Sequence, residues 1–280
     1  MLFRSVAHAQ LGDPATCTGV NGGPEVPGIT VSSFAVDAYE VTVGRFRAFV
    51  RARAEALRGI RARPVAYPGR SLAWEGAGAL PPENGSPGCG SACTWTASPG
   101  RFERMPVLAV DLWTAQEFCV WDGGRLPTEA EWEYVARGRA VASEGLTPGR
   151  TYPWGEAVPR TTAPCDRAHV AGACGGDLET SHREVGRFPP TGGVYDLAGN
   201  AREHCIDHFD NYGPTSLGCW RTSPLRDPLC RVSYPNTGNV FRSGAQMGSS
   251  GLAGHLLRAT ARNDVLYGDA LGFRCVRSRP

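Results

Sequence analysis

The sequence predicts a mixed α+β domain that has little regular secondary structure and is braced by disulfide bonds. Glycine and proline account for 36 and 22 of its 280 residues, so helices and strands must be short and irregular backbone common. The chain contains an even number of cysteines, ten, which can join loops that a hydrophobic core alone would not hold. The length suits one large domain or two small ones.

Strands are expected where short apolar runs stand between turn-forming residues. Residues 31–41 predict a strand that leads into a helix, and Thr42 can cap that helix. Near the C-terminal end, short apolar runs at 240–241, 256–257 and 272–276 predict further strands.

Two further helices are expected at capping boxes, in which a threonine precedes a glutamate by three residues. One box begins at Thr114 and includes Glu117; the other begins at Thr128 and includes Glu131. Glu129 and Glu131 are typical first-turn carboxylates, which the helix dipole favours. We interpret them as capping residues and not as a paired-carboxylate acid/base site.

The domain is expected to span residues 31–280, after a leader at 1–30. Two stretches rich in proline, glycine and serine, 62–104 and 211–238, predict irregular surface excursions. Residues 7–9 resemble a cleavage site, but the apolar stretch before them is too short for a signal peptide, which we expect to be absent or truncated. No apolar run approaches the roughly 20 residues of a membrane span, so none is expected.

The charge of the chain gives no reason to expect nucleic acid as a partner. The net charge is +2, and all 29 cationic side chains are arginine. Nucleic-acid-binding domains usually carry a much stronger basic field. We interpret the absence of lysine as coding bias and not as chemistry.

The cysteines predict disulfides in an oxidising compartment, and hence a secreted or periplasmic protein. A structural zinc site and free thiols are the alternatives, but no C-x-x-C pair occurs. Three pairs close in sequence lie in loop-like stretches, namely Cys89 with Cys93, Cys165 with Cys174, and Cys219 with Cys230.

Six motifs resemble, in order, those of the formylglycine-generating enzyme, or sulfatase-modifying factor, family. They are residues 40–46 (EVTVGRF), 105–121 (MPVLAVDLWTAQEFCVW), 124–134 (GRLPTEAEWEY), 152–155 (YPWG), 193–203 (GVYDLAGNARE) and 271–275 (LGFRC). The resemblance covers residues 36 to 277. It implies the family's elaborated C-type-lectin-like α+β fold, which is rich in loops.

The resemblance also implies a disulfide between Cys119 and Cys275. The positions of a second family disulfide hold Ala136 and Ala259, so both of its members are absent together. If all ten cysteines are paired, Cys17 and Cys205 are what remains.

A calcium site is implied by the resemblance at residues 196–203. Asp196 and Glu203 would supply side chains, and Gly199 and Ala201 carbonyl oxygens, which are ligands that calcium prefers. The alternative is a self-satisfied turn in which Asn200 bonds the backbone. We expect calcium to be structural.

Active enzymes of the family activate dioxygen with copper(I) held by two cysteines, and the resemblance places that pair within residues 244–257. This stretch contains no cysteine, and Ser249 and Gly254 occupy the two positions. Copper(I) requires soft sulfur ligands. Met247 and His255 could form only a different site. We therefore expect no copper and no formylglycine-generating activity.

Two functions remain open. The first is a non-catalytic module that binds an unknown protein or glycan. Its candidate ligand-binding residues are Gln246, Ser249, Ser250, His255, Asn263, Asp264 and Tyr267. The second is an active oxidase that uses another thiol, such as Cys219 or Cys230, to convert a substrate cysteine to formylglycine.

Overall fold

The structure, a computed structural model, describes most of the chain and leaves parts of it undescribed. Side chains and backbone are described for residues 29–87, 93–136, 150, 152–155, 165–169, 174, 182–210, 218–220, 225–232, 238–243 and 271–278. For residues 4–7, 137–138 and 262–264 only the backbone is described.

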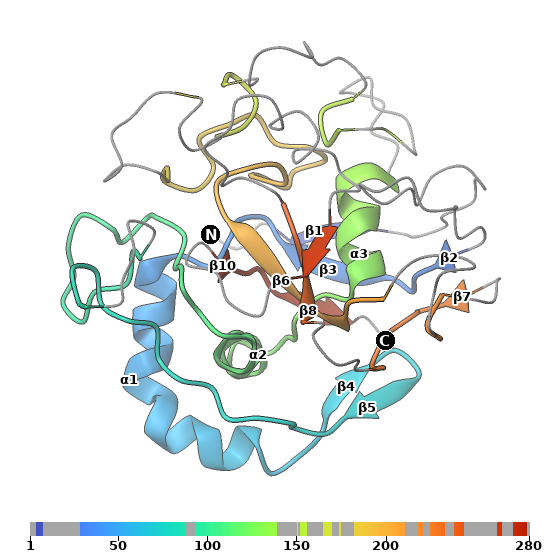
Figure 1. Cartoon of the computed structure of the whole chain (residues 1–280), viewed down its shortest axis with the longest axis horizontal. Helices are drawn as coiled ribbons and strands as arrows, with labels where there is room; N and C mark the ends of the chain where they lie inside the picture. The colour runs from blue at the N-terminus through green and yellow to red at the C-terminus, as the bar shows by residue number, and fades with distance from the viewer. Residues whose placement is uncertain are drawn as a thin grey trace.

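Three α-helices and one π-helical turn occur in the described residues: α1 (Val43–Ile60), α2 (Leu112–Trp121), α3 (Glu129–Glu133) and η1 (Tyr134–Gly138). Figure 1 shows α1 beside α2, and α3 beside the central strands. None of these helices is long and apolar enough to cross a membrane.

Two of the three predicted caps are confirmed. Thr42 accepts a hydrogen bond from the backbone N–H of Arg45 at 3.3 Å and starts α1. The capping box of α3 is complete, because Thr128 accepts from the Glu131 N–H while the Glu131 carboxylate accepts from the Thr128 N–H.

The predicted start of α2 at Thr114 is wrong. The N-cap lies three residues earlier, at Asp111, which accepts from the Thr114 N–H at 2.8 Å, and the helix begins at Leu112. A carboxylate is a stronger acceptor than a hydroxyl at a helix N-terminus. The Thr114 hydroxyl instead donates to the carbonyl of Ala79 at 2.7 Å.

In the described part of the chain, the strands form four small sheets. They are β1 (Arg4–Ala7), β3 (Phe34–Asp37) and β11 (Val276–Ser278); β10 (Leu271–Gly272), β6 (Arg202–His208), β8 (Asn239–Arg242) and β9 (Arg262–Asp264); β2 (Ile29–Thr30) and β7 (Leu225–Arg226); and β4 (Val65–Tyr67) and β5 (Arg70–Leu72). The mixed, loop-rich α+β class is confirmed.

The predicted strands are partly confirmed. The run at 240–241 lies in β8, and the run at 31–41 contains β3. The run at 272–276 is divided between two different sheets, because β10 ends at Gly272 and β11 begins at Val276. The run at 256–257 lies outside the described residues.

The first and last parts of the chain meet in one sheet. Strand β3 pairs antiparallel with β11, so the two ends of the predicted domain are adjacent. Residues 4–7, from the predicted leader, form β1 on the other edge of β3.

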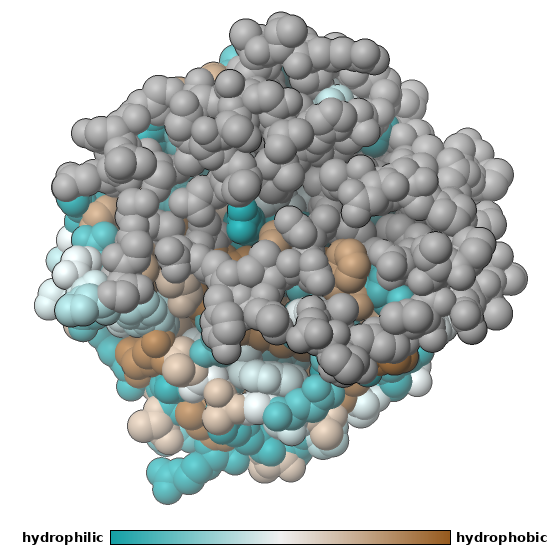
Figure 2. Space-filling view, in the orientation of Figure 1, coloured by the Kyte–Doolittle hydropathy of each residue, from teal (hydrophilic) through white to brown (hydrophobic). Residues whose placement is uncertain are grey.

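An aromatic core joins α1, α2 and the C-terminal segment. The rings of Phe46, Phe118 and Phe273 are completely buried and lie within 6.5 Å of one another by centroid. The disulfide between Cys119 and Cys275 lies in the same cluster. At the surface, Figure 2 shows hydrophobic and hydrophilic residues interspersed over the described part of one face.

Three predicted disulfides are confirmed: Cys119–Cys275, Cys165–Cys174 and Cys219–Cys230. Cys93 is disulfide-bonded as well, and its predicted partner Cys89 lies outside the described residues. The expectation that all ten cysteines are paired is wrong, because Cys205 is a free, buried thiol on β6. Cys17 lies outside the described residues.

A strap of small residues, 76–79, lies against the start of α2. Its backbone bonds to the helix, since Gly78 N–H donates to Glu117 and Ala79 N–H donates to Asp111. A Cβ atom at Gly78 would overlap the backbone nitrogen of Thr114. Only glycine therefore allows this close approach.

We expect Gly78→Ala to destabilise the protein by about 1–3 kcal/mol, because the added methyl forces the strap away from α2. Urea unfolding measures the change. Gly59→Ala in α1 is the matched control, since nothing lies within 4 Å of its Cβ direction. That variant should be slightly more stable than the wild type, by about 0.5–1 kcal/mol. Equal stability of the Gly78 variant and the wild type would contradict the close approach.

Candidate functional site

The predicted ligand-binding stretch connects two neighbouring strands. Strands β8 and β9 pair antiparallel, with Val240 opposite Asp264 and Arg242 opposite Arg262. Both ends of the intervening connection are thus held in one register. Asn263 and Asp264 lie on β9, where only the backbone is described. The other candidates lie outside the described residues: Gln246, Met247, Ser249, Ser250, Gly254, His255 and Tyr267.

A buried ion-pair cluster anchors the start of this connection. Arg242 has no exposed side-chain surface, and its Nη2 donates to Glu129 at 2.8 Å and to Glu133 at 2.7 Å. Its guanidinium also lies over the Trp132 ring at 5.9 Å. Buried charges of this kind must be compensated by partners. Glu129 is therefore a structural counter-ion, a role that the first-turn interpretation missed.

Glu131, the other first-turn carboxylate, also has an arginine partner. Arg125 donates two hydrogen bonds to it, at 2.7 and 2.6 Å, and both side chains are buried. Glu131 thus combines its capping role with a buried ion pair. The absence of an acid/base role for this carboxylate stays a prediction.

Asp207 links the N-terminus of α3 to the Cys219–Cys230 disulfide. Its two oxygens accept from the N–H groups of Glu129 at 2.7 Å and Cys230 at 2.6 Å. Burial, together with the nearby Glu129 carboxylate, raises the pKa of Asp207 to about 7, although the two N–H donors oppose this. The side chain therefore titrates near neutral pH.

Cys205 lies on β6 in the same polar interior. Burial raises the pKa of its thiol well above the usual value, and the positive charge of Arg242 only partly opposes this. The thiolate is the reactive and metal-binding form of cysteine. Cys205 is therefore protonated at neutral pH and is a poor nucleophile and a poor copper ligand.

The carboxylate of Glu203, one of the predicted calcium ligands, is occupied by protein groups. Arg274 donates to both of its oxygens at 2.6 Å, and the Trp132 indole N–H donates to Oε2 at 2.9 Å. Glu203 and Arg274 are both buried. The cation that balances Glu203 is thus a guanidinium.

The backbone of residues 199–201 is also bonded within the protein. The Gly199 carbonyl accepts from the Ser243 hydroxyl at 3.0 Å, and the Ala201 N–H donates to Glu40 at 2.9 Å. The Asn200 amide donates to Glu40 at 2.7 Å and accepts from the Arg183 N–H at 2.9 Å. These contacts match the alternative of a self-satisfied turn.

Asp196 is the predicted calcium ligand whose carboxylate keeps one oxygen without a hydrogen bond to a described residue. One oxygen accepts from the Gly186 N–H at 2.6 Å, while Oδ1 is buried without a hydrogen-bond partner among the described residues. Burial is the main cause that raises its pKa to about 6, and the Glu203 charge adds to the shift. One spare oxygen does not make the coordination shell that calcium requires. With Glu203 bound by Arg274, the side chains as they lie do not favour calcium, and the calcium site stays a prediction.

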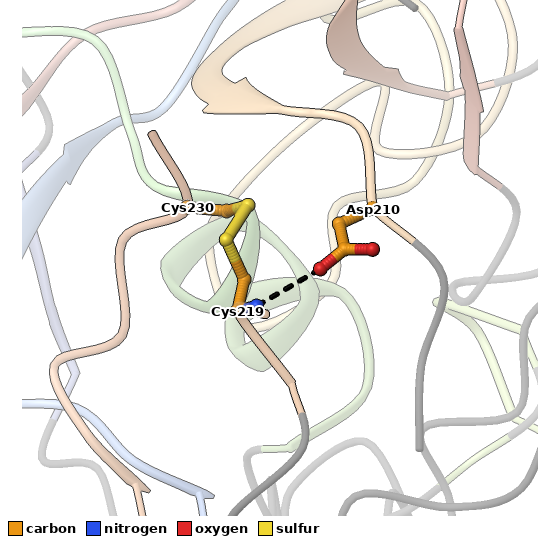
Figure 3. Close-up of side chains that lie close together, drawn as sticks. All are labelled: Asp210, Cys219 and Cys230. Atoms are coloured by element: carbon orange, nitrogen blue, oxygen red, sulfur yellow. Dashed lines mark hydrogen bonds between the residues drawn. A yellow bond between two sulfur atoms is a disulfide. The ribbon is translucent and has the colours of Figure 1, made fainter. Parts of the chain in front are cut away.

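Asp210, Cys219 and Cys230 bring their ligand atoms within 4.8 Å of one another (Figure 3). The two sulfurs are bonded to each other, so the group is a disulfide and not the zinc site that was the alternative. Asp210 accepts from the N–H of Cys219 at 2.9 Å and steadies the loop. Neither cysteine is a free thiol.

Sequence reasoning missed the arginines that hold the interior together, chiefly Arg242 and Arg274. Arginine is abundant in the sequence, so composition does not single out the buried ones. The signal that the sequence offered for Arg274 was its position between Phe273 and Cys275 in the LGFRC motif. Arg242, which follows the apolar pair Val240 and Phe241 in β8, offered even less.

Comparisons with known proteins place the chain among sulfatase-modifying factors. A family model, "Sulfatase-modifying factor enzyme 1-like domain", matches residues 13–279. A "Formylglycine-generating enzyme" of Thermomonospora curvata is 31% identical over 263 residues, covering 80% of each chain. An "Inactive C-alpha-formylglycine-generating enzyme 2" of Bos taurus is 29% identical, covering 92% of this chain and 81% of that one. Treponema denticola variable protein 1 has a similar fold, with a TM-score of 0.55 at 17% identity, covering 99% and 95% of the two chains.

We expect Arg274→Met to destabilise the protein by about 3–5 kcal/mol, because it leaves the Glu203 carboxylate buried without its counter-ion. Urea unfolding at neutral pH measures the loss. The double variant with Glu203→Gln should be more stable than the single variant, since it removes the uncompensated charge. A single variant within about 1 kcal/mol of the wild type would show that the pair is not required.

The Cys205 thiol is expected to be inert in the folded protein. Ellman's reagent should not modify it in native buffer. When the proteins are denatured without reduction, the wild type should show one more reactive thiol than a Cys205→Ala variant. The physical reason is the burial that keeps this sulfur protonated and covered. Rapid reaction of Cys205 in the folded protein would contradict this.

Proposed function

Since the chain belongs to the sulfatase-modifying factor enzyme 1-like family, we propose that it is a non-catalytic member that binds another molecule outside the cytoplasm. The family match covers residues 13–279 and thus nearly the whole sequence. The relatives include proteins named as enzymes and proteins named as inactive, so membership alone does not choose between the two.

This proposal rests on which cysteine thiols could bind copper(I). The stretch 244–257 contains no cysteine, and the two positions expected for copper ligands hold Ser249 and Gly254. Elsewhere, each cysteine with a described side chain is disulfide-bonded, except the buried thiol of Cys205. A copper(I) centre needs deprotonated sulfur ligands. Because the one free thiol among the described cysteines, Cys205, is buried, these observations favour a function without dioxygen activation.

A location in an oxidising compartment fits the same observations. Three disulfides join described residues, and one of them, Cys119–Cys275, spans a sequence separation of 156. Bonds of this type persist in secreted and periplasmic proteins and are rare in the cytosol. We therefore place the protein outside the cytoplasm.

The binding surface is proposed on the β8–β9 connection and on β9 itself. Loops held by a rigid scaffold are where binding residues usually lie. Here the scaffold consists of the paired strands and the buried Arg242 cluster below them. The partner is a protein or a glycan. The candidate contacts are Gln246, Ser249, Ser250, His255, Asn263 and Asp264, together with Tyr267, which follows β9 in the sequence.

The alternative is an active oxidase that converts a substrate cysteine to formylglycine. The 31% identity with the Thermomonospora curvata protein favours it. The disulfide between Cys219 and Cys230 counts against it, since these were the thiols that could have replaced the missing pair.

An oxygen-consumption assay separates the two functions. The purified protein, loaded with copper(I), is mixed with a cysteine-containing sulfatase peptide, and the peptide is analysed by mass spectrometry for aldehyde. We expect neither oxygen uptake nor aldehyde, because residues 244–257 contain no cysteine and the free thiol among the described residues, Cys205, is buried.

A Ser249→Cys/Gly254→Cys double variant should gain copper(I) binding if these positions face each other as in the family. The Ser249→Cys single variant is the matched control and should gain much less. Conversion of the peptide by the wild-type protein would overturn the non-catalytic proposal.

A further inference from the structure

A pocket of about 500 Å³ lies where α1 and α2 end. Gly59 and Ile60 contribute from the last turn of α1, and Val120, Gly123 and Gly124 from the end of α2. None of its lining residues belongs to the β8–β9 connection or to the loop at 196–203. Its volume falls within the range of small-molecule sites.

The charge around the pocket is positive. Three arginines and no acidic residue line it. Arg125 is buried against Glu131, and Arg277 pairs with Asp37 at 2.7 Å, so both charges are compensated. Arg63 is exposed and makes no ion pair with any described residue. One guanidinium is therefore available to an anion.

A hydroxyl donor lies at the same pocket. Ser278 lines it, and its Oγ accepts from Arg125 Nε at 3.2 Å and Nη2 at 3.1 Å. A hydroxyl that accepts from a guanidinium keeps its own proton for another acceptor. Arg63 and Ser278 thus offer donors of the kind that a carboxylate accepts.

The rest of the lining is apolar and leaves space. Ile60, Val65 and Val120 supply hydrocarbon surface, which a bare inorganic anion would not use. At Gly59 and Gly123, which also line the pocket, nothing lies within 4 Å of the direction that a side chain would take. A larger side chain at Gly59, which lines the pocket, would add bulk at its wall without meeting a neighbouring atom.

We propose that this pocket binds a small carboxylate that carries a short apolar chain. Arg63 and Ser278 hold the carboxylate, and the apolar wall covers the chain. The inference is independent of the function proposed above, since it uses none of the same residues. It assigns the chain a ligand site separate from the β8–β9 connection.

Ligand-detected NMR on the intact protein tests the proposal with three probes: hexanoate, hexylammonium and inorganic phosphate. Hexanoate should bind saturably. Hexylammonium has the same chain with the opposite charge and should not bind. Phosphate lacks the chain and should bind at least about tenfold more weakly. No saturable binding of hexanoate, or equal binding of hexylammonium, would overturn the proposal.

Variants locate the binding. Arg63→Ala should weaken hexanoate binding by about tenfold or more, whereas Arg58→Ala, an exposed arginine of α1 that does not line the pocket, should leave it unchanged. Gly59→Leu should abolish binding by filling the space without removing a charge. Equal effects of the two arginine variants, or full binding by the Gly59→Leu protein, would show that hexanoate binds elsewhere.

Discussion

The buried pair of Arg274 and Glu203 is the contact on which the arrangement of the core depends. Glu203 is fully buried and Arg274 is 1% exposed, so each charge can exist there only because of the other. The same guanidinium donates to the carbonyls of Asp37 and Tyr195. One side chain thereby joins β3, β6 and the C-terminal segment. The disulfide of the next residue, Cys275, ties this junction to α2.

Buried arginine pairs recur wherever short elements meet. Arg125 joins the segment before α3 to Glu131, and Arg242 joins β8 to Glu129. Short strands and loops bury limited apolar surface and leave many polar backbone groups to satisfy. Arginine suits this task, because it has five donors in a fixed planar arrangement and a charge that is retained on burial. Residues 124–134 (GRLPTEAEWEY) therefore supply a framework of buried ion pairs that positions the loops.

This framework separates the parts of the molecule that hold the fold from those available for function. Among the described residues, each cysteine is disulfide-bonded except the buried Cys205, and the buried carboxylates of Glu129 and Glu203 pair with arginines. The two proposed sites lie apart from these pairs: one follows the fixed end of β8, and the other is the pocket beside Arg63, which makes no ion pair with a described residue.

The sequence by itself determined the fold class, two helix caps and three disulfides, since these follow from local patterns such as Thr128 with Glu131 or from the motifs around Cys119 and Cys275. It did not determine that Asp111 caps α2, that Cys205 is unpaired or that Arg274 forms an ion pair with Glu203. Those outcomes depend on which groups meet across large sequence separations. Competition for a shared acceptor is settled only when tertiary packing brings the donors together, because the energy of a buried charge depends on its surroundings and not on its neighbours in the chain.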